Sequence, residues 1–343
     1  MENNIVRKDL ESFADQAPFL NELRGETIMV TGATGLIGST FIKCMLVLNE
    51  KWNAGIHIMG IARSPEKAES MFGGESITWL YQDMRDPMRI PDVSIDYIVH
   101  CANSTSSKFY VEHPVENINT AYLGTNHILE YARIHQVKSL VYLSSLESYG
   151  TVDHDGKITE DMMGYILPTD VRSSYSLGKR AVECLCHCYA MEYGVPVKIA
   201  RLTQTFGAGV SLEDSRVFAQ FAKSIIRGED IVMHTKGESA KPYCYIIDAV
   251  RAILYLLFAG RDGEAYNVAN SNTYISIHDM AEFLIDKFNP DCKLVMELKD
   301  NLGYAPVTRL NLDTTKLESL GWKPEYGLEA MYGSLIEYYK IKM

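Results

Sequence analysis

Three glycines between a short apolar strand and an apolar helix are the feature that most limits how this chain can fold. Thr27 to Val30 has the pattern of a strand, and apolar side chains recur at helical spacing from Phe41 to Leu46. Glycines spaced by three residues at such a junction allow a tight turn, let the backbone approach a pyrophosphate, and pack the helix closely on the strand. The pattern predicts a dinucleotide-binding turn made by Gly32, Thr34, Gly35, Leu36, Ile37 and Gly38.

Strands and helices alternate over the following residues. Further strands are predicted at 56–62, 77–81, 97–100, 140–143 and 197–202, with long helices at 115–135 and 174–193. This alternation is typical of a parallel sheet covered by helices on both faces. After residue 203 the predicted elements are shorter, with helices at 216–227, 247–257 and 277–288.

We therefore expect an α/β fold, namely a Rossmann-type doubly wound parallel sheet with a smaller C-terminal α/β substrate lobe. An N-terminal extension occupies residues 1–24, with helical character from Leu10 to Leu23. The dinucleotide-binding domain is expected over 25–203, including the catalytic residues, and residues 204–343 are expected mainly to bind substrate.

Composition excludes several classes of function. No apolar run of about 18 residues occurs, which argues against a membrane-spanning helix, and the first twenty residues lack the apolar stretch of a secretory signal. We expect a cytoplasmic enzyme. The net charge of −11, without a basic stripe, argues against nucleic acid as a partner.

The cysteine content indicates reduced thiols. Seven cysteines are an odd number, and they are scattered mostly through apolar segments. Cys184, Cys186 and Cys188 flank His187, but residues two apart on a helix point in different directions. We predict no metal site there.

The choice of nicotinamide cofactor depends on the end of the second strand. An NAD site usually carries an acidic residue at that point, whereas this chain has Arg63 and Ser64 there. Arg63 and Ser64 suit a 2′-phosphate, which favours NADP over NAD, although Arg63 as a solvated cation is the alternative. Asp83, next to Met84, is placed to accept a hydrogen bond from the adenine amino group, or else to shape a turn.

A tyrosine and a lysine four residues apart are the most specific chemical feature. Tyr175 and Lys179 share one face of a predicted helix. A lysine cation beside the phenol is expected to lower its pKa from near 10 and so prepare a general base for hydroxyl oxidation. Ser145 follows a predicted strand, where its hydroxyl can bind the substrate oxygen.

Taken together, these motifs resemble the extended short-chain dehydrogenase/reductase family, in its nucleotide-sugar epimerase, dehydratase and decarboxylase branch. The resemblance covers residues 26–325 and also includes Asp83, the strand end at His100-Cys101-Ala102, the Gly124-Thr125 pair, the run from Arg201 to Gly207, the segment Asp214 to Val217, and Leu320-Gly321-Trp322.

The resemblance implies a tightly held NAD or NADP that oxidises a nucleotide-diphosphate sugar at C4, assisted by Tyr175, Lys179 and Ser145. Met84, Cys101 and Ala102 are then expected beside the cofactor. Candidate substrate contacts are Gln204, Arg216, Lys241 and Arg309, each with a solvated surface role as its alternative. Three residues depart from the family pattern: Gln204 replaces a frequent Asn, Lys241 a usual Arg, and Ala121 a frequent Asn.

The type of reaction depends on Glu147. By resemblance, dehydratases and decarboxylases commonly carry Glu two positions after the catalytic hydroxyl, where it can remove the proton at C5. Leu146 stands where some dehydratases have an acid, and it can donate no proton to a leaving group at C6. We predict a 4,6-dehydratase or a uronic-acid decarboxylase; 4-epimerisation, a net reductase or dehydrogenase, and a non-catalytic cofactor-sensing regulator remain alternatives. A decarboxylase needs a cation near the sugar carboxylate, for which Arg172 and Lys108 are available.

Relatives in this branch commonly dimerise through two helices, which correspond here to residues 115–135 and 174–193. Both carry apolar stripes that can form an intersubunit bundle or pack within the subunit. We predict a homodimer. The stripes are Ile118, Tyr122, Ile128 and Leu129 on the first helix, and Val182, Leu185 and Tyr189 on the second.

Overall fold

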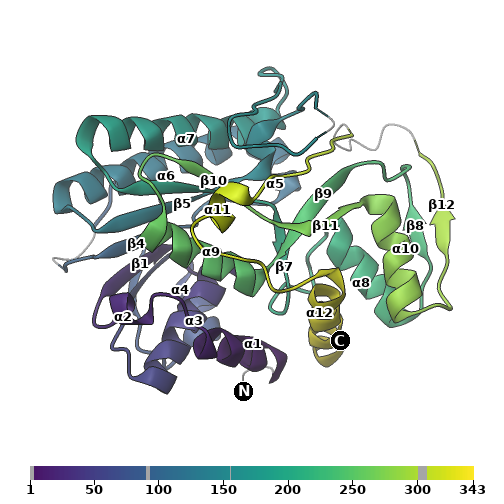
Figure 1. Ribbon diagram of the computed structural model, residues 1–343, viewed down its shortest axis with the longest axis horizontal. Coiled ribbons are helices and arrows are strands. Elements are labelled where there is room, and N and C mark those ends of the chain that lie inside the picture. The colour runs from purple at the N-terminus through teal and green to yellow at the C-terminus, as the bar shows by residue number, and fades with distance from the viewer. Residues whose placement is uncertain (1–3, 90–92, 155, 300–306) are drawn as a thin grey trace.

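The computed structural model describes residues 4–89, 93–154, 156–299 and 307–343. Its centre is a seven-stranded sheet in the order β10-β6-β5-β4-β1-β2-β3, and all neighbouring strands are parallel (Figure 1). The predicted doubly wound parallel sheet is confirmed. Its strands are β1 (Thr27–Thr31), β2 (His57–Ala62), β3 (Thr78–Tyr81), β4 (Tyr97–His100), β5 (Ser139–Ser145), β6 (Val197–Leu202) and β10 (Ala265–Val268).

Alternating side chains divide the core into two layers. Ile28 and Val30 of β1 point into one layer, while Met29 between them belongs to the other. The first layer is covered by α3 (Leu36–Trp52) and α9 (Ile246–Ala259), and the second by α6 (Pro114–His135) and α7 (Ser173–Tyr193), which lie on opposite sides of the sheet in Figure 1. The shorter α4 (Pro65–Phe72) connects β2 to β3, and α5 (Ser107–Glu112) follows β4.

The C-terminal part of the chain contributes both to this sheet and to a separate lobe. Strand β10 pairs with β6, and α9 belongs to the same core as β1, so the predicted boundary after residue 203 does not separate the strands of the large sheet. The lobe contains a three-stranded sheet of β7 (Gln204–Phe206), β9 (Ala240–Tyr245) and β11 (Asn270–Ser276), and a pair of β8 (Ile231–Met233) and β12 (Leu294–Met296).

Aromatic packing holds the lobe together. Helices α8 (Val217–Arg227), α10 (Ile277–Phe288) and α12 (Leu328–Lys342) pack around the small sheet, and α11 (Thr315–Glu318) is a single turn beside β10. The ring of Phe206 stacks on Phe218 with centroids 4.5 Å apart and contacts Tyr332 at 4.9 Å. This packing fixes β7 and β9, whose residues include Gln204 and Lys241. Over the residues that the structure describes, no helix has both the length and the apolar character needed to cross a bilayer.

The N-terminal extension folds differently from the prediction. Instead of one helix from Leu10 to Leu23, the chain forms α1 (Asn4–Asp15) and the short α2 (Leu20–Leu23); residues 1–3 lie outside the described part. Pro18 disfavours helical geometry in the residue before it, and Phe19 has a φ of +59°. The break turns the chain so that Leu10, Phe13 and Ala14 of α1 join the main core.

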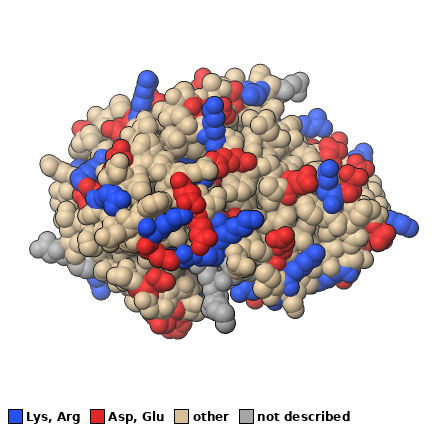
Figure 2. Space-filling model, turned by 60° about the horizontal axis from the view of Figure 1, so that its bottom comes forward, with Lys and Arg blue, Asp and Glu red and all other residues tan. Residues whose placement is uncertain are grey.

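Polar contacts fasten α1 to both parts of the molecule. Arg7 pairs with Glu50 of α3 at 2.7 Å, and the indole nitrogen of Trp52 donates to the carbonyl of Ala14 at 2.9 Å. On the other side, buried Asp9 accepts a hydrogen bond from the hydroxyl of Tyr245, at the end of β9. Figure 2, which brings the lower part of Figure 1 forward, shows acidic and basic side chains side by side over this face.

Candidate active site

The glycine turn after β1 has a geometry that side chains would prevent. Gly32 has a φ of +64°, and a Cβ there would stand 3.0 Å from the Cα of Ala102. A Cβ on Gly38 would lie 2.5 Å from the carbonyl oxygen of Gly32. Gly35 caps the N-terminus of α3, and Leu36 and Ile37 form its first turn. Free backbone amides and the positive end of a helix dipole at this point fit the pyrophosphate of a dinucleotide.

A buried hydrogen-bond chain fixes the turn against the end of β4. Thr31 Oγ1 contacts His100 Nδ1 at 2.6 Å, and His100 Nε2 contacts Thr125 Oγ1 at 3.0 Å. Burial lowers the pKa of His100 to about 3, so the imidazole is neutral near pH 7. Because the amide of Ala102 donates to Thr31 Oγ1 at 3.2 Å, Cys101 and Ala102 lie beside the glycine turn, where the sequence predicts cofactor contacts.

The residues assigned to the adenosine end gather after β2 and β3, and several already have partners. The hydroxyl of Ser64 accepts from the amide of Lys67 at 3.1 Å and caps α4, while the side chain of Arg63 is 69% exposed. Asp83 accepts from Arg85 through the backbone amide, Nε and Nη2, each at 2.9 Å, so it shapes a turn. Its contact with adenine stays a prediction. Met84 is buried, with its Cβ 3.0 Å from where a Cβ on Gly124 would lie.

The predicted catalytic residues meet at the carboxyl ends of β4 and β5, next to the point where the strand order reverses. Ser145 ends β5, and Tyr175 and Lys179 lie in the first turns of α7. The hydroxyl groups of Ser145 and of Tyr110 on α5 lie near enough to the Tyr175 hydroxyl to lower its pKa. The Lys179 ammonium donates to the carbonyl of Leu143 at 2.6 Å and lies 5.8 Å from the centre of the Tyr175 ring. Ligands of doubly wound folds bind at such a position.

The expected lowering of the Tyr175 pKa by Lys179 is wrong for this structure. Burial raises the pKa of Tyr175, and the charge of Glu147 adds to this effect; the hydrogen bonds from Ser145 and Tyr110 and the charge of Arg216 oppose it. Burial also lowers the pKa of Lys179 to about 8. The Lys179 ammonium donates a hydrogen bond to the Leu143 carbonyl. Among the effects that oppose the rise in the Tyr175 pKa, the neighbouring hydroxyl groups are therefore the largest.

Glu147 faces a group of cations. It lies in a 3-10 turn, Leu146–Tyr149, where its amide donates to Ser145 Oγ at 3.2 Å. Desolvation raises the pKa of Glu147, whereas the nearby charges of Lys241 and Arg172 lower it. Burial likewise lowers the pKa of Lys241, against the attraction of Glu147. Glu147 is exposed to the space in front of the sheet, and two positive charges, from β9 and from the start of α7, act on its carboxylate.

The predicted substrate residues lie on the neighbouring lobe. Gln204 of β7 pairs with Tyr243 of β9, two residues after Lys241. Arg216 caps α8, pairs with Asp214, and lies near enough to Tyr175 to affect its pKa. Arg309 pairs in backbone register with Ala240, but its side chain is 64% exposed and 4.0 Å from Glu238. The structure thus brings Lys241 and Arg216 to the catalytic group, while Arg309 points to solvent.

Two sets of residues escaped the sequence prediction. Glu183, one helical turn after Lys179, accepts from Ser144 Oγ and from Arg201 Nη2 at 2.8 Å, forming a buried ion pair beneath the site. Tyr110 stacks on Tyr175 from α5. For Tyr110 a signal did exist, since it follows the loop after β4, at the sheet edge where ligands bind; nothing in the sequence indicated the contact of Glu183 with Ser144.

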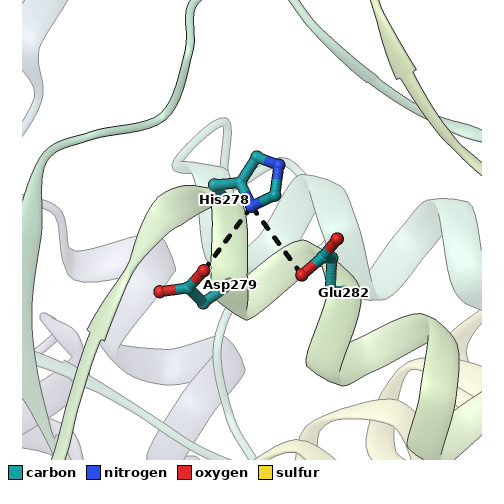
Figure 3. A group of neighbouring side chains, drawn as sticks. All are labelled: His278, Asp279 and Glu282. Carbon is teal, nitrogen blue, oxygen red and sulfur yellow. Dashed lines mark ion pairs between the residues drawn. The ribbon is translucent and has the colours of Figure 1, made fainter.

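The lobe also carries a small cluster of possible metal ligands. His278 Nδ1 lies 3.5 Å from Asp279 and 3.8 Å from Glu282 on the surface of α10 (Figure 3). All three side chains are at least 38% exposed, and mutual ion pairs account for their arrangement, so we assign them no metal. In the cysteine-rich part of α7, Cys186 is buried whereas Cys184 and Cys188 are exposed, as expected for residues two apart.

Together, the glycine turn and the Ser145–Tyr175–Lys179 group define a protein of the Rossmann class with a serine, a tyrosine and a lysine gathered at its switch point. The chain belongs to the NAD-dependent epimerase/dehydratase family, whose model matches residues 28–269.

Individual relatives agree with this assignment. The chain is 28% identical over 318 residues to UDP-glucuronic acid decarboxylase 6 of Arabidopsis thaliana, covering 92% of this chain and 89% of the relative. It is 26% identical over 343 residues to UDP-glucuronic acid decarboxylase 1 of Danio rerio, covering 97% and 78%.

Solved structures share the fold. The UDP-glucose 4-epimerase of Thermotoga maritima, solved with UDP-glucose, superposes with a TM-score of 0.78 at 22% identity, covering 92% of this chain and 99% of the other. A dTDP-glucose 4,6-dehydratase from Bacillus anthracis, solved with NAD, gives 0.75 at 20% identity, covering 92% and 97%.

Proposed function

We propose that this protein is an NAD(P)-dependent enzyme that decarboxylates a nucleotide-activated uronic acid through a C4-keto intermediate. The observation that carries the proposal is the electrostatic environment of Glu147, whose carboxylate is influenced by the charges of Lys241 and Arg172 and in turn acts on the Tyr175 hydroxyl. The relatives named UDP-glucuronic acid decarboxylase cover nearly the whole chain and support the same chemistry.

The neighbours of Glu147 favour loss of carbon dioxide over loss of water. A 4,6-dehydratase needs an acid to protonate the leaving group at C6, but Leu146 is apolar and 7% exposed. Decarboxylation needs no such acid, because a carboxylate two bonds from a ketone leaves as carbon dioxide and its bonding electrons move to the ketone oxygen. A cation is required to hold the carboxylate, and half-buried Arg172 is near enough to Glu147 to lower the pKa of that residue. Lys108, the other cation considered, is 80% exposed and pairs with Glu112.

Each polar residue then has a defined task. When bound, the nicotinamide supplies the hydride acceptor and donor for C4. Tyr175 takes the proton of the C4 hydroxyl, Ser145 holds that oxygen by a hydrogen bond, and Lys179 supplies positive charge below the Tyr175 ring. Glu147 returns a proton to C5 after the carboxylate has left, which its raised pKa favours. Arg216 and Lys241 bind the diphosphate, with Gln204 beside them.

The cofactor and the substrate are expected to bind to different parts of the molecule. The large sheet holds the dinucleotide, and β7, β9 and α8 hold the nucleoside diphosphate of the sugar. Arg63 follows β2, where the sequence has no carboxylate of its own, and contacts the 2′-phosphate of NADP in place of Glu116, from which its guanidinium lies 3.9 Å away. Binding measurements with both cofactors test this preference: Arg63→Ala weakens NADP and leaves NAD unchanged, and equal weakening of both contradicts it.

We further propose a cytoplasmic homodimer. Ile128, Leu129 and Val182 of the predicted stripes are buried within the subunit, so that part of the expectation is corrected. The surface available to a second copy is an apolar face of α6 made by Val115, Ile118 and Tyr122, exposed by 70%, 42% and 44%. Sedimentation of the wild-type chain as a dimer and of Ile118→Glu as a monomer is expected, and a monomeric wild type at micromolar concentration contradicts the proposal.

Mass spectrometry of reaction mixtures tests the function. The enzyme is incubated with NAD or NADP and a panel of nucleotide hexoses and nucleotide uronic acids. A product lighter by carbon dioxide (~44 Da), formed from a uronic acid, is the expected result of the acid–base site. Loss of water (~18 Da) identifies a dehydratase, and an unchanged mass with altered retention identifies an epimerase. Either of these results refutes decarboxylation.

A further inference from the structure

A second tyrosine lies against the predicted catalytic tyrosine. Tyr110, on α5, is 3% exposed, and its ring is parallel to that of Tyr175, with centroids 4.3 Å apart and an interplanar angle of 9°. Ser174 holds this part of α5 by donating to the Tyr110 carbonyl at 3.2 Å, and Asn117 of α6 donates to Ser174 Oγ at 3.4 Å. The stack is therefore fixed from three helices.

The hydroxyl groups of the two stacked rings also interact, and this interaction lowers the pKa of Tyr175. Once Tyr175 has lost its proton, only the Tyr110 hydroxyl can donate in this contact. Burial is the main cause of the raised pKa of Tyr110, and the charges of Tyr175 and Glu147 add to it, so Tyr110 keeps its proton. A donor in a buried site stabilises an oxyanion more than it would in water.

We propose that Tyr110 is a positioning residue that stabilises the phenolate of Tyr175 by donating a hydrogen bond to its oxygen and that fixes the ring by stacking. The proposal rests on the proposed function, in which Tyr175 removes the proton of the C4 hydroxyl. In that step the sugar O–H bond breaks and the Tyr175 O–H bond forms, while Tyr110 retains its own proton throughout. The phenolate is thus stabilised from α5, a different helix from the one that carries Tyr175.

The variant Tyr110→Phe tests the hydroxyl alone, because it removes the hydroxyl group and keeps the stacked ring. Loss of the donor raises the pKa of Tyr175, so kcat at pH 7 is expected to fall about 10-fold while KM stays within about twofold. The acidic limb of the kcat profile moves to higher pH by about one pH unit, and activity recovers under alkaline conditions. A role confined to packing would leave the limb in place. The matched control is Tyr332→Phe, a buried tyrosine of α12 whose hydroxyl contacts Met280 Sδ at 3.0 Å.

A second readout requires no turnover. In protein labelled with ¹³C at tyrosine Cζ, the resonance of Tyr175 is identified by its loss in Tyr175→Phe. It is expected to shift in Tyr110→Phe and to stay in place in Tyr332→Phe. An unmoved resonance, or a moved resonance with an unmoved pH limb, overturns the proposal.

The two readouts also separate this proposal from the function on which it rests. If the wild type converts no nucleotide sugar, the proposed function fails, and the resonance alone decides whether Tyr110 donates to Tyr175. If the wild type is active but neither readout responds to Tyr110→Phe, the function stands and the role of Tyr110 is refuted.

Discussion

The buried carboxylate of Asp9 is expected to make the attachment of the N-terminal helix depend on pH. Asp9 lies between α1 and β9, and burial raises its pKa from 3.8 to about 6, against the hydrogen bond from Tyr245 and the charge of Lys8. Because the pKa is higher in the folded state, ionisation disfavours folding. Stability is therefore lost as the pH rises from about 4 through 6, and the loss is complete near pH 7.

The size of this effect follows from the shift. A rise from 3.8 to about 6 corresponds to about 3 kcal/mol at pH 7. Asp9→Asn keeps the hydrogen bond with Tyr245 and removes the charge, so it should recover most of that amount. With an unfolding entropy of about 2 cal/mol/K per residue, 343 residues give a rise in Tm of about 4 °C at pH 7.

Thermal unfolding of the wild type and Asp9→Asn between pH 5 and 8 measures the prediction. The wild type should lose more stability between pH 5 and 7 than the variant, in which buried Asp248, with a pKa raised to about 7, still titrates. Asp15→Asn is the control, because Asp15 is on the same helix, is 57% exposed, and pairs with Lys51 at the surface, where such pairs contribute about 1 kcal/mol or less. A destabilised Asp9→Asn at pH 7, or equal pH dependence in both proteins, refutes the reasoning.

Three further outcomes are expected. Gly38→Ala places a Cβ 2.5 Å from the carbonyl oxygen of Gly32 and should weaken cofactor binding at least about 10-fold, as measured by calorimetry. The control Gly333→Ala has open space around the new Cβ and should leave the affinity unchanged. Equal affinities of the two variants contradict this prediction. Tyr175→Phe should lower kcat about 10²- to 10⁴-fold and leave binding of nucleoside diphosphate intact, and near-normal turnover would exclude Tyr175 as the base. Glu183→Gln leaves the buried Arg201 without a counter-charge and should destabilise the protein by about 3–5 kcal/mol in denaturant titrations; an unchanged midpoint would show that the ion pair contributes nothing.

The sequence predicted the sheet well where local pattern and tertiary structure agree. Strands at 97–100 and 197–202 have the predicted bounds, because short apolar runs between turns form buried parallel strands. The N-terminal helix was misplaced, since apolar spacing continues across Pro18 although the helix does not. Strand β10 was missed, because its four residues carry no periodic signal and depend on pairing with β6.

Site residues could be predicted where a sequence motif marks them. They could not be predicted where tertiary packing alone brings them to the site. The glycine turn, Ser145 and the Tyr175–Lys179 pair follow from spacing. The stacking of Tyr110 on Tyr175 joins residues 65 positions apart in the chain, and the pKa of Tyr175 depends on burial that no spacing reveals. For the same reason, the cations beside Glu147 became an argument about the reaction only when β9 and α7 were placed together.

The central claim is that the hydride leaves C4 and returns to it while carbon dioxide is lost between these two steps. Its most direct test is the conversion of a nucleotide glucuronic acid deuterated at C4, followed by mass spectrometry of the product. The account predicts a product lighter by carbon dioxide (~44 Da) that retains deuterium, with no net accumulation of reduced cofactor. A product that has kept its carboxylate, or has lost its deuterium to the cofactor, would contradict it.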